Sequence, residues 1–439
     1  MSLKKLALVL AAMPAMFAAM FVLSSTCASG QTEKVLHSFN NNGSDGYQPE
    51  GGVSFDAAGN LFGTTQLGGT GACIHNGLPS GCGTVYALIP RSNGDWIEKV
   101  LHSFILNGKD GLEPAGNGLI LDAAGNLYGM TVLGGTSADC PNDLMGTSGC
   151  GTVFAMRKSK TGFSPPVILH SFDGDNKGVD GRMPFGTPTF DSAGNLYGTA
   201  SSGGTAGYGM AFKLTRRAGA PWHETAMYNF YDNGIDPTGS LIFDAEGDLY
   251  GLAAGGGQYA AGAVFELTPN TQGGWSEKGL HSFGHGTDGF QPLGSLIFDK
   301  AGTLYGVTTG AVNEFGTVFE LTPGTGGTWT EKVLHVFTKN GTDGLGPNSP
   351  LVMDASGNLY GTTGAGGSGA CSGGCGTVYE LSPQAGGTWS ETILYSFLNN
   401  GADGIEPTSG LTFDSSGNLY GVTSGGGVNG NGTVYEVRP

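Results

Sequence analysis

A segment close to Asp-x-x-Gly-Asn-Leu-Tyr-Gly occurs seven times along the chain, and this repetition constrains the fold more than any other feature. Its copies begin at Asp56, Asp122, Asp191, Asp244, Asp299, Asp354 and Asp414. Each unit holds four short apolar runs in one order, close to GLIFD, NLYGTT, GTVFEL and EKVLHSF, with Gly, Pro, Asn and Asp between them. Short apolar runs bounded by turn residues predict four strands per unit.

These runs are apolar in both phases of the strand alternation, as in Val85, Tyr86, Ala87 and Leu88. A strand that is buried on both faces has this pattern. Blades stacked around an axis bury both faces, whereas a sandwich leaves one face of each sheet polar. We therefore predict an all-β fold, a seven-bladed β-propeller of four-stranded antiparallel blades.

The two ends of the repeat region supply complementary parts of one blade. Residues 33–39 carry the outermost run, EKVLHSF, and residues 432–437 carry the third run, GTVYEV. The N-terminal strand is therefore expected to join the last blade and close the ring, which removes the exposed ends of an open array. Residues 30–439 are predicted to form this single domain.

Residues 1–29 differ from everything that follows them. Lys4 and Lys5 precede an apolar run over residues 6–23, and small residues follow it. This order predicts a removable signal peptide and a secreted, periplasmic or cell-surface protein. A retained membrane anchor is the alternative, and Cys27 raises lipid attachment, although Ser24, Ser25 and Thr26 match such sites poorly. No later segment is long and apolar enough to span a bilayer.

Six cysteines support export, because they fall in pairs at one part of the repeat. The second cysteine of each pair directly precedes Gly-Thr-Val. We predict three local disulfides, Cys73–Cys82, Cys140–Cys150 and Cys371–Cys375. A zinc site is disfavoured, since only His75 lies near a pair and four ligands would be needed.

The net charge of −17 and the lack of a basic patch argue against nucleic acid and anionic membranes as partners. We expect a monomer. The five tryptophans and Phe163 recur just before the outer run, which predicts packing. The outer-run histidines His37, His102, His170, His281 and His335, replaced elsewhere by Asn229 and Tyr395, are predicted to be structural.

The units NLYGTTxxGG, GTVFEL and WxExVLHSF resemble the Gloeo/Verruco (GloVer) tandem repeat of bacterial exported proteins. The resemblance covers nearly everything after residue 29. It implies a propeller-like exported protein without an assigned activity. The chain stops directly after its last strand, at Pro439, so anchoring through a C-terminal tail is not expected.

One face of the predicted propeller gathers the variable loops. The inter-blade loops carry an Asp-Gly-x-x-Pro signature at Asp45, Asp110, Asp180, Asp288, Asp343 and Asp403. Turn chemistry is the favoured explanation of these residues. A calcium collar is the alternative, since oxygen ligands on tight loops suit Ca²⁺, and Asp173, Asp175 and Asp180 come nearest to a calcium loop. No cofactor is otherwise indicated.

A catalytic site in a repeat protein should depart from the repeat. The departures here are Lys177, Arg182, Tyr208 and Tyr259, with His75 and His285 in variable loops. They could serve a polysaccharide lyase or glycoside hydrolase. No nucleophile elbow, Walker loop, dinucleotide fingerprint or His-Glu-x-x-His occurs. The favoured function is a non-enzymatic binding or scaffold propeller that recognises a glycan or an extracellular protein through this loop-rich face.

Overall fold

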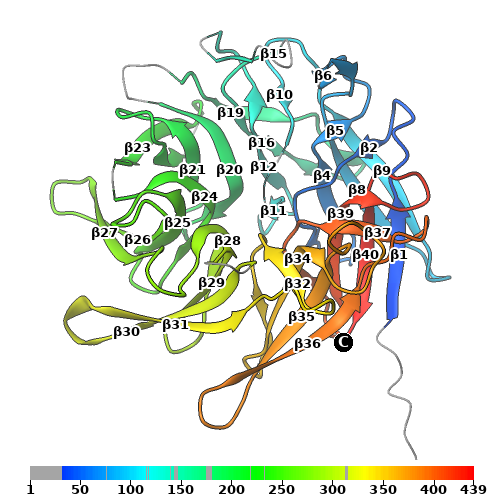
Figure 1. Cartoon of the computed structure of the whole chain (residues 1–439). Coiled ribbons are helices and arrows are strands. Elements are labelled where there is room, and N and C mark those ends of the chain that lie inside the picture. The colour runs from blue at the N-terminus through cyan, green and yellow to red at the C-terminus, as the bar shows by residue number, and fades with distance from the viewer. Residues whose placement is uncertain are drawn as a thin grey trace, which may run out of the picture.

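The computed structural model describes residues 32–439 except 76, 115, 117, 139, 143–146, 175–179, 218, 232 and 312–314. The predicted signal peptide and Cys27 lie outside this part of the chain. Within it, the strands form seven antiparallel blades arranged in a ring (Figure 1), as the repeat predicted. No helix among these residues has the length and apolar character needed to cross a membrane.

The first four blades follow each other along the chain. Blade 1 contains β3 (Ser54–Phe55), β4 (Leu61–Thr65), β8 (Thr84–Pro90) and β9 (Trp96–Ser103). Blade 2 contains β11 (Ile120–Leu121), β12 (Leu127–Thr131), β16 (Thr152–Met156) and β19 (Val167–Ser171). Blade 3 contains β20 (Gly181–Phe190), β21 (Leu196–Gly203), β22 (Met210–Thr215) and β23 (His223–Asn229). Blade 4 contains β24 (Ile235–Phe243), β25 (Leu249–Gly255), β26 (Ala263–Pro269) and β27 (Trp275–Ser282).

The remaining blades repeat this order. Blade 5 contains β28 (Phe290–Phe298), β29 (Leu304–Gly310), β30 (Thr317–Pro323) and β31 (Trp329–Val336). Blade 6 contains β32 (Gly344–Pro347) and β33 (Val352–Met353), both paired with β34 (Leu359–Gly366), then β35 (Thr377–Pro383) and β36 (Trp389–Ser396). Blade 7 contains β37 (Gly404–Pro407) and β38 (Thr412–Phe413), both paired with β39 (Leu419–Gly426), then β40 (Thr433–Arg438).

Shorter elements lie outside these sheets. A 3₁₀ turn spans Thr325–Gly327. The two-stranded pairs are β2 (Gly46–Tyr47) with β5 (Leu67–Gly68), β10 (Gly111–Leu112) with β13 (Leu133–Gly134), β6 (Ile74–His75) with β7 (Leu78–Pro79), β14 (Pro141–Asn142) with β15 (Thr147–Ser148), and β17 (Lys158–Ser159) with β18 (Gly162–Phe163).

The ring closes as the two chain ends predicted. β1 (Thr32–Ser38) pairs antiparallel with β40, from Thr32 opposite Arg438 to Ser38 opposite Thr433. In Figure 1 the blue first strand lies beside the red last strand. The N-terminal segment therefore supplies the outermost strand of blade 7, and the two ends are held together without a covalent bond.

Each pair of neighbouring blades encloses one apolar cluster. Seven such clusters occur among the described residues, and each draws on two adjacent blades. Aromatic side chains link the blades, as where Trp275 of blade 4 meets Tyr197 of blade 3 edge to face at 6.3 Å. Trp96, Trp329 and Trp389 make the same contact at their own blades. These contacts confirm that the tryptophan positions serve packing.

The repeated Asp-x-x-Gly-Asn segment forms the tight turn between the first two strands of a blade. Asp56 Oδ1 accepts hydrogen bonds from the backbone N–H groups of Ala58 and Asn60, and Gly59 adopts φ +81°. Burial alone would raise the pKa of Asp56, but the hydrogen bonds from Asn60, Lys158 and Ala58 lower it below its ordinary value. The aspartate and the glycine thus fix the tight turn of this hairpin.

A second repeated feature joins blades at the start of each inner strand. The residue before the repeated proline has a positive φ in all seven blades: Gln48, Glu113, Met183, Asp236, Gln291, Gly346 and Glu406. Each donates its N–H to a carbonyl of the preceding blade's loop, as Glu113 does to Cys82 at 2.9 Å. Six of the seven carry a side chain in a backbone region that favours glycine, so these inter-blade hydrogen bonds hold a strained conformation.

Candidate functional site

A groove lies at the outer rim between blades 4 and 5. Its volume is about 850 Å³. The β25–β26 connection contributes Gln258 and Tyr259, β27 contributes Gly279 and His281, and the β27–β28 connection contributes His285. Two of the predicted candidate residues, Tyr259 and His285, meet here.

Gly279 leaves space for the groove. It lies opposite Phe265 in the ladder between β26 and β27. The equivalent ladder positions of the other blades hold Val35, Val100, Ile168, Ala226, Val333 and Ile393. A Cβ atom at Gly279 would meet only Glu277 Oε1, at 3.9 Å. The missing side chain therefore exposes the outer strand of blade 4.

An aromatic pair stands at the edge of this groove. The rings of Tyr259 and His285 stack with centroids 5.4 Å apart and planes 28° from parallel. Tyr259 remains 43% exposed, so part of its apolar surface is free to contact a ligand. The backbone N–H of His285 donates to Asp288 Oδ1 at 2.9 Å, which fixes the loop that carries the imidazole.

The floor of the groove is polar and partly buried. His281 Nε2 and Asp288 Oδ2 form a hydrogen bond of 3.1 Å. Burial lowers the pKa of His281, and the neighbouring Asp288 carboxylate opposes this effect. Burial raises the pKa of Glu331 to about 7, helped by the charges of Asp288 and Glu320. No lysine or arginine is among the described residues that line the groove.

The same polar group recurs where other blades meet. A histidine or tyrosine of one outer strand faces the Asp of the following inter-blade loop, and a glutamate of the next outer strand completes the group. The glutamates are Glu33, Glu98, Glu224, Glu277, Glu331 and Glu391, and Pro166 stands at the seventh position. The repeat pattern did not identify these glutamates as candidate site residues, although each lies four residues before the histidine or tyrosine of its own run.

One sequence assignment at this position is wrong. Tyr228, and not Asn229, replaces the histidine in blade 3, because Tyr228 lies opposite Ala211 as His102 lies opposite Val85. All seven blades carry the same β-bulge at this place, so the ungapped alignment of residues 224–230 with residues 98–104 also puts Tyr228 at the histidine position. Asn229 instead takes the place of the following serine, and its Oδ1 accepts the N–H of Thr205.

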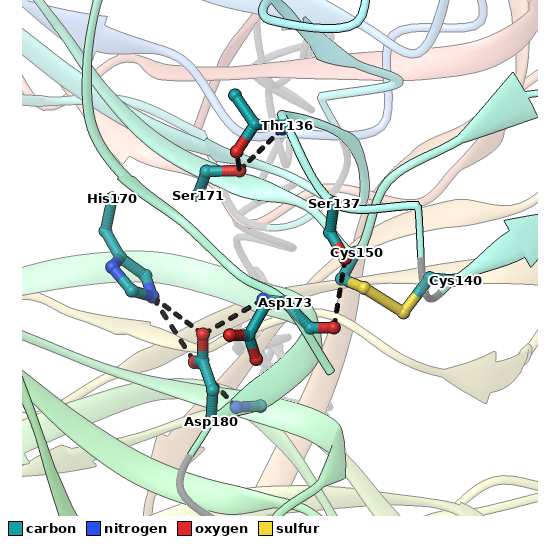
Figure 2. The surroundings of a disulfide bond; sticks show 9 residues. Thr136, Ser137, Cys140, Cys150, His170, Ser171, Asp173 and Asp180 are labelled. Carbon is teal, nitrogen blue, oxygen red and sulfur yellow. Dashed lines mark hydrogen bonds and ion pairs between the residues drawn. A yellow bond between two sulfur atoms is a disulfide. The ribbon is translucent and has the colours of Figure 1, made fainter. Parts of the chain in front are cut away.

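The histidine and aspartate are hydrogen-bonded at three junctions. His102 Nε2 lies 2.9 Å from Asp110 Oδ2, and His170 Nε2 lies 3.2 Å from Asp180 Oδ2. His281 and Asp288 form the third pair. Figure 2 shows the imidazole of His170 directed at the carboxylate of Asp180, which also accepts the N–H of Asp173. These contacts support the structural role predicted for the histidines.

The pairs His37–Asp45 and His335–Asp343 are more open. In both, Nε2 lies 3.5 Å from the nearest carboxylate oxygen, and neither Nε2 has a hydrogen-bond partner. With Glu98 and Glu391 respectively, they form the two groups of His, Asp and Glu whose ligand atoms lie within 4.8 Å of one another in the described chain. These groups could hold a metal ion.

The six aspartates predicted on the ligand face turn their carboxylates into the junctions. Five of them are at most 6% exposed, and the side chain of Asp110 is 10% exposed. Their oxygens accept backbone N–H groups, as Asp343 does from Thr338 at 2.8 Å and Asp403 from Leu398 at 2.7 Å. They therefore order the inter-blade loops, as turn chemistry predicted.

The other predicted candidates lie in separate loops. Arg182 is the second residue of β20 and lies opposite Ser202, and Tyr208 lies in the β21–β22 connection of the same blade, 43% exposed. His75 lies in β6 of blade 1, with Nδ1 3.9 Å from Glu113. Lys177 and Asp175 lie outside the described residues. Among described residues, no hydrogen bond or ion pair joins Arg182, Tyr208 and Tyr259.

The three predicted disulfides are confirmed. Cys73–Cys82, Cys140–Cys150 and Cys371–Cys375 each close a loop between the second and third strands of a blade. Figure 2 shows the second of them near the His170–Asp180 pair. The carbonyl of each second cysteine accepts the N–H of the positive-φ residue in the next blade, so each disulfide supports an inter-blade contact. Disulfides are typical of proteins that fold in an oxidising compartment.

A smaller cavity of about 480 Å³ lies at the ring axis. All seven blades contribute to its wall, including Glu50, Phe185, Asp236, Leu293, Asn348 and Thr408. Asp236 is itself the positive-φ residue before the repeated proline, and the others come shortly after that residue in their own blades. Their side chains differ from blade to blade. None of the five candidate catalytic residues that the structure describes lies on this wall.

A model described as the Gloeobacter/Verrucomicrobia repeat matches residues 143–372 and 280–439, more than half of the chain. No curated protein matches the chain. Similar solved structures include a Thermus thermophilus protein described as a putative oxidoreductase (glucose dehydrogenase), with 14% identity, TM-score 0.44, and 93% of this chain and 100% of that chain covered. A Trypanosoma rangeli sialidase in complex with sialic acid has 12% identity and TM-score 0.40 over 80% and 56% of the two chains. Such identities assign no function to this chain.

Proposed function

We propose a function for this chain, which belongs to the Gloeobacter/Verrucomicrobia repeat family: it is a secreted binding protein that recognises a glycan in the groove between blades 4 and 5. One observation carries the proposal. This groove coincides with the places where blade 4 departs from the repeat, namely Gly279 and the connections that carry Tyr259 and His285. Grooves at three other junctions have volumes of about 410–580 Å³, so the greater volume here goes with the missing side chain at Gly279.

The chemistry of the groove suits a sugar. The exposed face of Tyr259 offers an apolar platform for the C–H face of a pyranose ring. Gln258, Asn233 and Ser282 offer hydrogen-bond donors and acceptors for hydroxyl groups around it. Without a lysine or arginine among the described lining residues, the groove favours a neutral glycan over an acidic one.

The test is a glycan array with the mature protein and three variants. Tyr259→Ala should weaken binding about tenfold, because loss of an aromatic platform costs on the order of 1 kcal/mol. Gly279→Val should reduce binding while preserving the fold, since the equivalent positions carry valine or isoleucine in five other blades. Tyr208→Ala is the matched control, because Tyr208 is an equally exposed loop tyrosine outside the groove.

The array should be repeated with calcium and with a chelator, because calcium was the cation that the loops suggested. A blank array under both conditions would contradict the proposal. An extracellular protein captured by wild type but not by Gly279→Val would then identify a protein partner for the same groove.

Glycoside hydrolysis is the second candidate. Glu331, with its pKa raised to about 7, and Asp288 line one groove, and glycosidases use two carboxyl groups in different environments. A lyase would need a cationic clamp for its acidic substrate, which the described lining residues do not provide. Release of reducing sugars from a polymer panel, lost in Glu331→Gln, would support hydrolysis. The recurrence of this glutamate at other junctions favours binding.

A further inference from the structure

The junction between blades 5 and 6 contains buried polar atoms that have no hydrogen-bond partner. His335 lies on β31, Asp343 on the β31–β32 connection and Glu391 on β36. His335 Nε2, Asp343 Oδ1 and Glu391 Oε1 are buried and form no hydrogen bond. The Asp343 side chain is only 4% exposed. A buried polar atom without a partner is costly, so three that face one another require an explanation.

The orientation of Asp343 is fixed by its other oxygen. Oδ2 accepts hydrogen bonds from the backbone N–H and the hydroxyl of Thr338, at 2.8 and 3.2 Å. Oδ1 is thereby left facing His335 at 3.5 Å, and His335 Nε2 lies 3.6 Å from Glu391 Oε1. The ligand atoms are therefore held by the loop and by two separate blades before any ion binds.

We propose that His335, Asp343 and Glu391 bind a divalent transition-metal cation of the zinc type, with an open coordination position toward solvent. Zinc bonds of about 2.0–2.2 Å in tetrahedral geometry place ligand atoms about 3.3–3.6 Å apart. The two separations from His335 Nε2 agree with this spacing. His335 is 20% exposed and Glu391 17%, which gives an ion access from the rim.

The ligand types select the class of cation. Calcium takes oxygen ligands in larger numbers, whereas imidazole nitrogen with carboxylate oxygen suits zinc and its neighbours. This site is therefore different from the calcium collar that the loop aspartates suggested. Three protein ligands leave one position for water or for a ligand of the protein.

A second copy lies where the ring closes. His37 on β1, Asp45 and Glu98 on β9 form the other group of three, with His37 Nε2 3.5 Å from Asp45 Oδ2. His37 Nε2 and Glu98 Oε1 are also without a hydrogen-bond partner. A cation here would connect the N-terminal strand, through His37, to blade 1.

The test measures zinc stoichiometry by equilibrium dialysis of the mature, chelator-treated protein. Wild type should bind two ions, and His335→Gln and Glu391→Gln should each bind one. Adding His37→Gln to His335→Gln should abolish binding. Zinc should also raise the melting temperature of wild type by several degrees, because a ligand that binds only the folded state stabilises it.

The matched control is His102→Gln at the junction between blades 1 and 2, where Pro166 replaces the glutamate. This variant should still bind two ions. Circular dichroism of the metal-free variants checks that each is folded. Wild type that binds no zinc at micromolar concentrations, or equal losses in His102→Gln and His335→Gln, would overturn the proposal.

Discussion

The junctions between blades 5 and 6 and between blades 1 and 2 are built from the same repeat but differ in their polar contacts. At the 1/2 junction, His102 is hydrogen-bonded to Asp110 at 2.9 Å, and Pro166 occupies the third position. At the 5/6 junction, His335 and Asp343 are 3.5 Å apart and Glu391 faces both. One repeat thus produces either a closed packing contact or an open polar group.

The glutamate alone does not cause the difference. Glu224 and Glu331 occupy the same position at two other junctions, yet His170 and His281 remain hydrogen-bonded to their aspartates. The 5/6 junction differs in Thr338, whose hydroxyl and N–H both bind one carboxylate oxygen. The 7/1 junction is open as well although Asn40 stands at the Thr338 position, so the threonine hydroxyl accounts for the 5/6 junction only.

The largest expected effect is common to both junctions. Asp110→Ala and Asp343→Ala should each destabilise the metal-free protein by about 2–4 kcal/mol, because each removes a largely buried carboxylate that accepts backbone N–H groups of the inter-blade loop. Thermal unfolding in a chelator measures the loss. Asparagine in place of either aspartate should cost less, since Asn233 stands at this position between blades 3 and 4. A large loss at only one junction would contradict a shared role of the carboxylate.

Reduction of the disulfides should loosen the 1/2 junction and leave the 5/6 junction unchanged. The carbonyl of Cys82 accepts the N–H of Glu113 at the 1/2 junction, whereas Phe315, in a loop without cysteines, accepts that of Gly346 at the 5/6 junction. Each disulfide contributes about 2–3 kcal/mol at most by chain-entropy arguments. Hydrogen exchange after reduction should accelerate at Glu113 and not at Gly346. Equal acceleration at both would show that the disulfides support the whole ring.

These comparisons also separate what the sequence could predict from what it could not. The strands, the sevenfold count, the ring closure and the disulfides follow from patterns that repeat, because repetition reveals each position several times. Gly279 and Glu331 were missed for the opposite reasons. Gly279 is one glycine among 83, and its effect depends on which face of the strand it leaves open. Glu331 repeats so regularly that only its burial distinguishes it from a solvated charge.

A change of pH should alter the stability of a junction that contains the glutamate. It should not do so in this way at the 1/2 junction, where Pro166 replaces the glutamate. Burial raises the pKa of Glu33 to about 8, with help from the charge of Asp403. The folded state then keeps a proton that the unfolded state releases near pH 4.5, so this glutamate makes stability fall as the pH rises from about 4.5 through 8. The melting temperature of Glu33→Gln, relative to wild type, should therefore be higher at pH 8.5 than at pH 5.5.

Two groups face Glu33 across the 6/7 junction, the Asp403 carboxylate and the Tyr395 hydroxyl, which is hydrogen-bonded to Asp403. The exposed Glu246→Gln is the control for the loss of one carboxyl group at the surface. All measurements use metal-free protein. A pH-independent difference for Glu33→Gln would show that this carboxyl group titrates alike in the folded and unfolded states.

The smallest change in stability, and the most direct test of the comparison, comes from converting one junction into the other. Pro166→Glu supplies the missing carboxylate to the 1/2 junction, and Ile105→Thr supplies the hydroxyl that Thr338 provides at the 5/6 junction. Ile105 is 41% exposed, so the double variant should change stability by less than about 1 kcal/mol.

The double variant should bind three zinc ions where wild type binds two, and Pro166→Glu alone should leave the count at two. In the single variant the His102–Asp110 hydrogen bond still occupies the imidazole nitrogen that a cation would need. Three ions with Pro166→Glu alone would assign the difference between the junctions to the glutamate. Two ions with the double variant would mean that the orientation of Asp343 by Thr338 does not determine which junction is open.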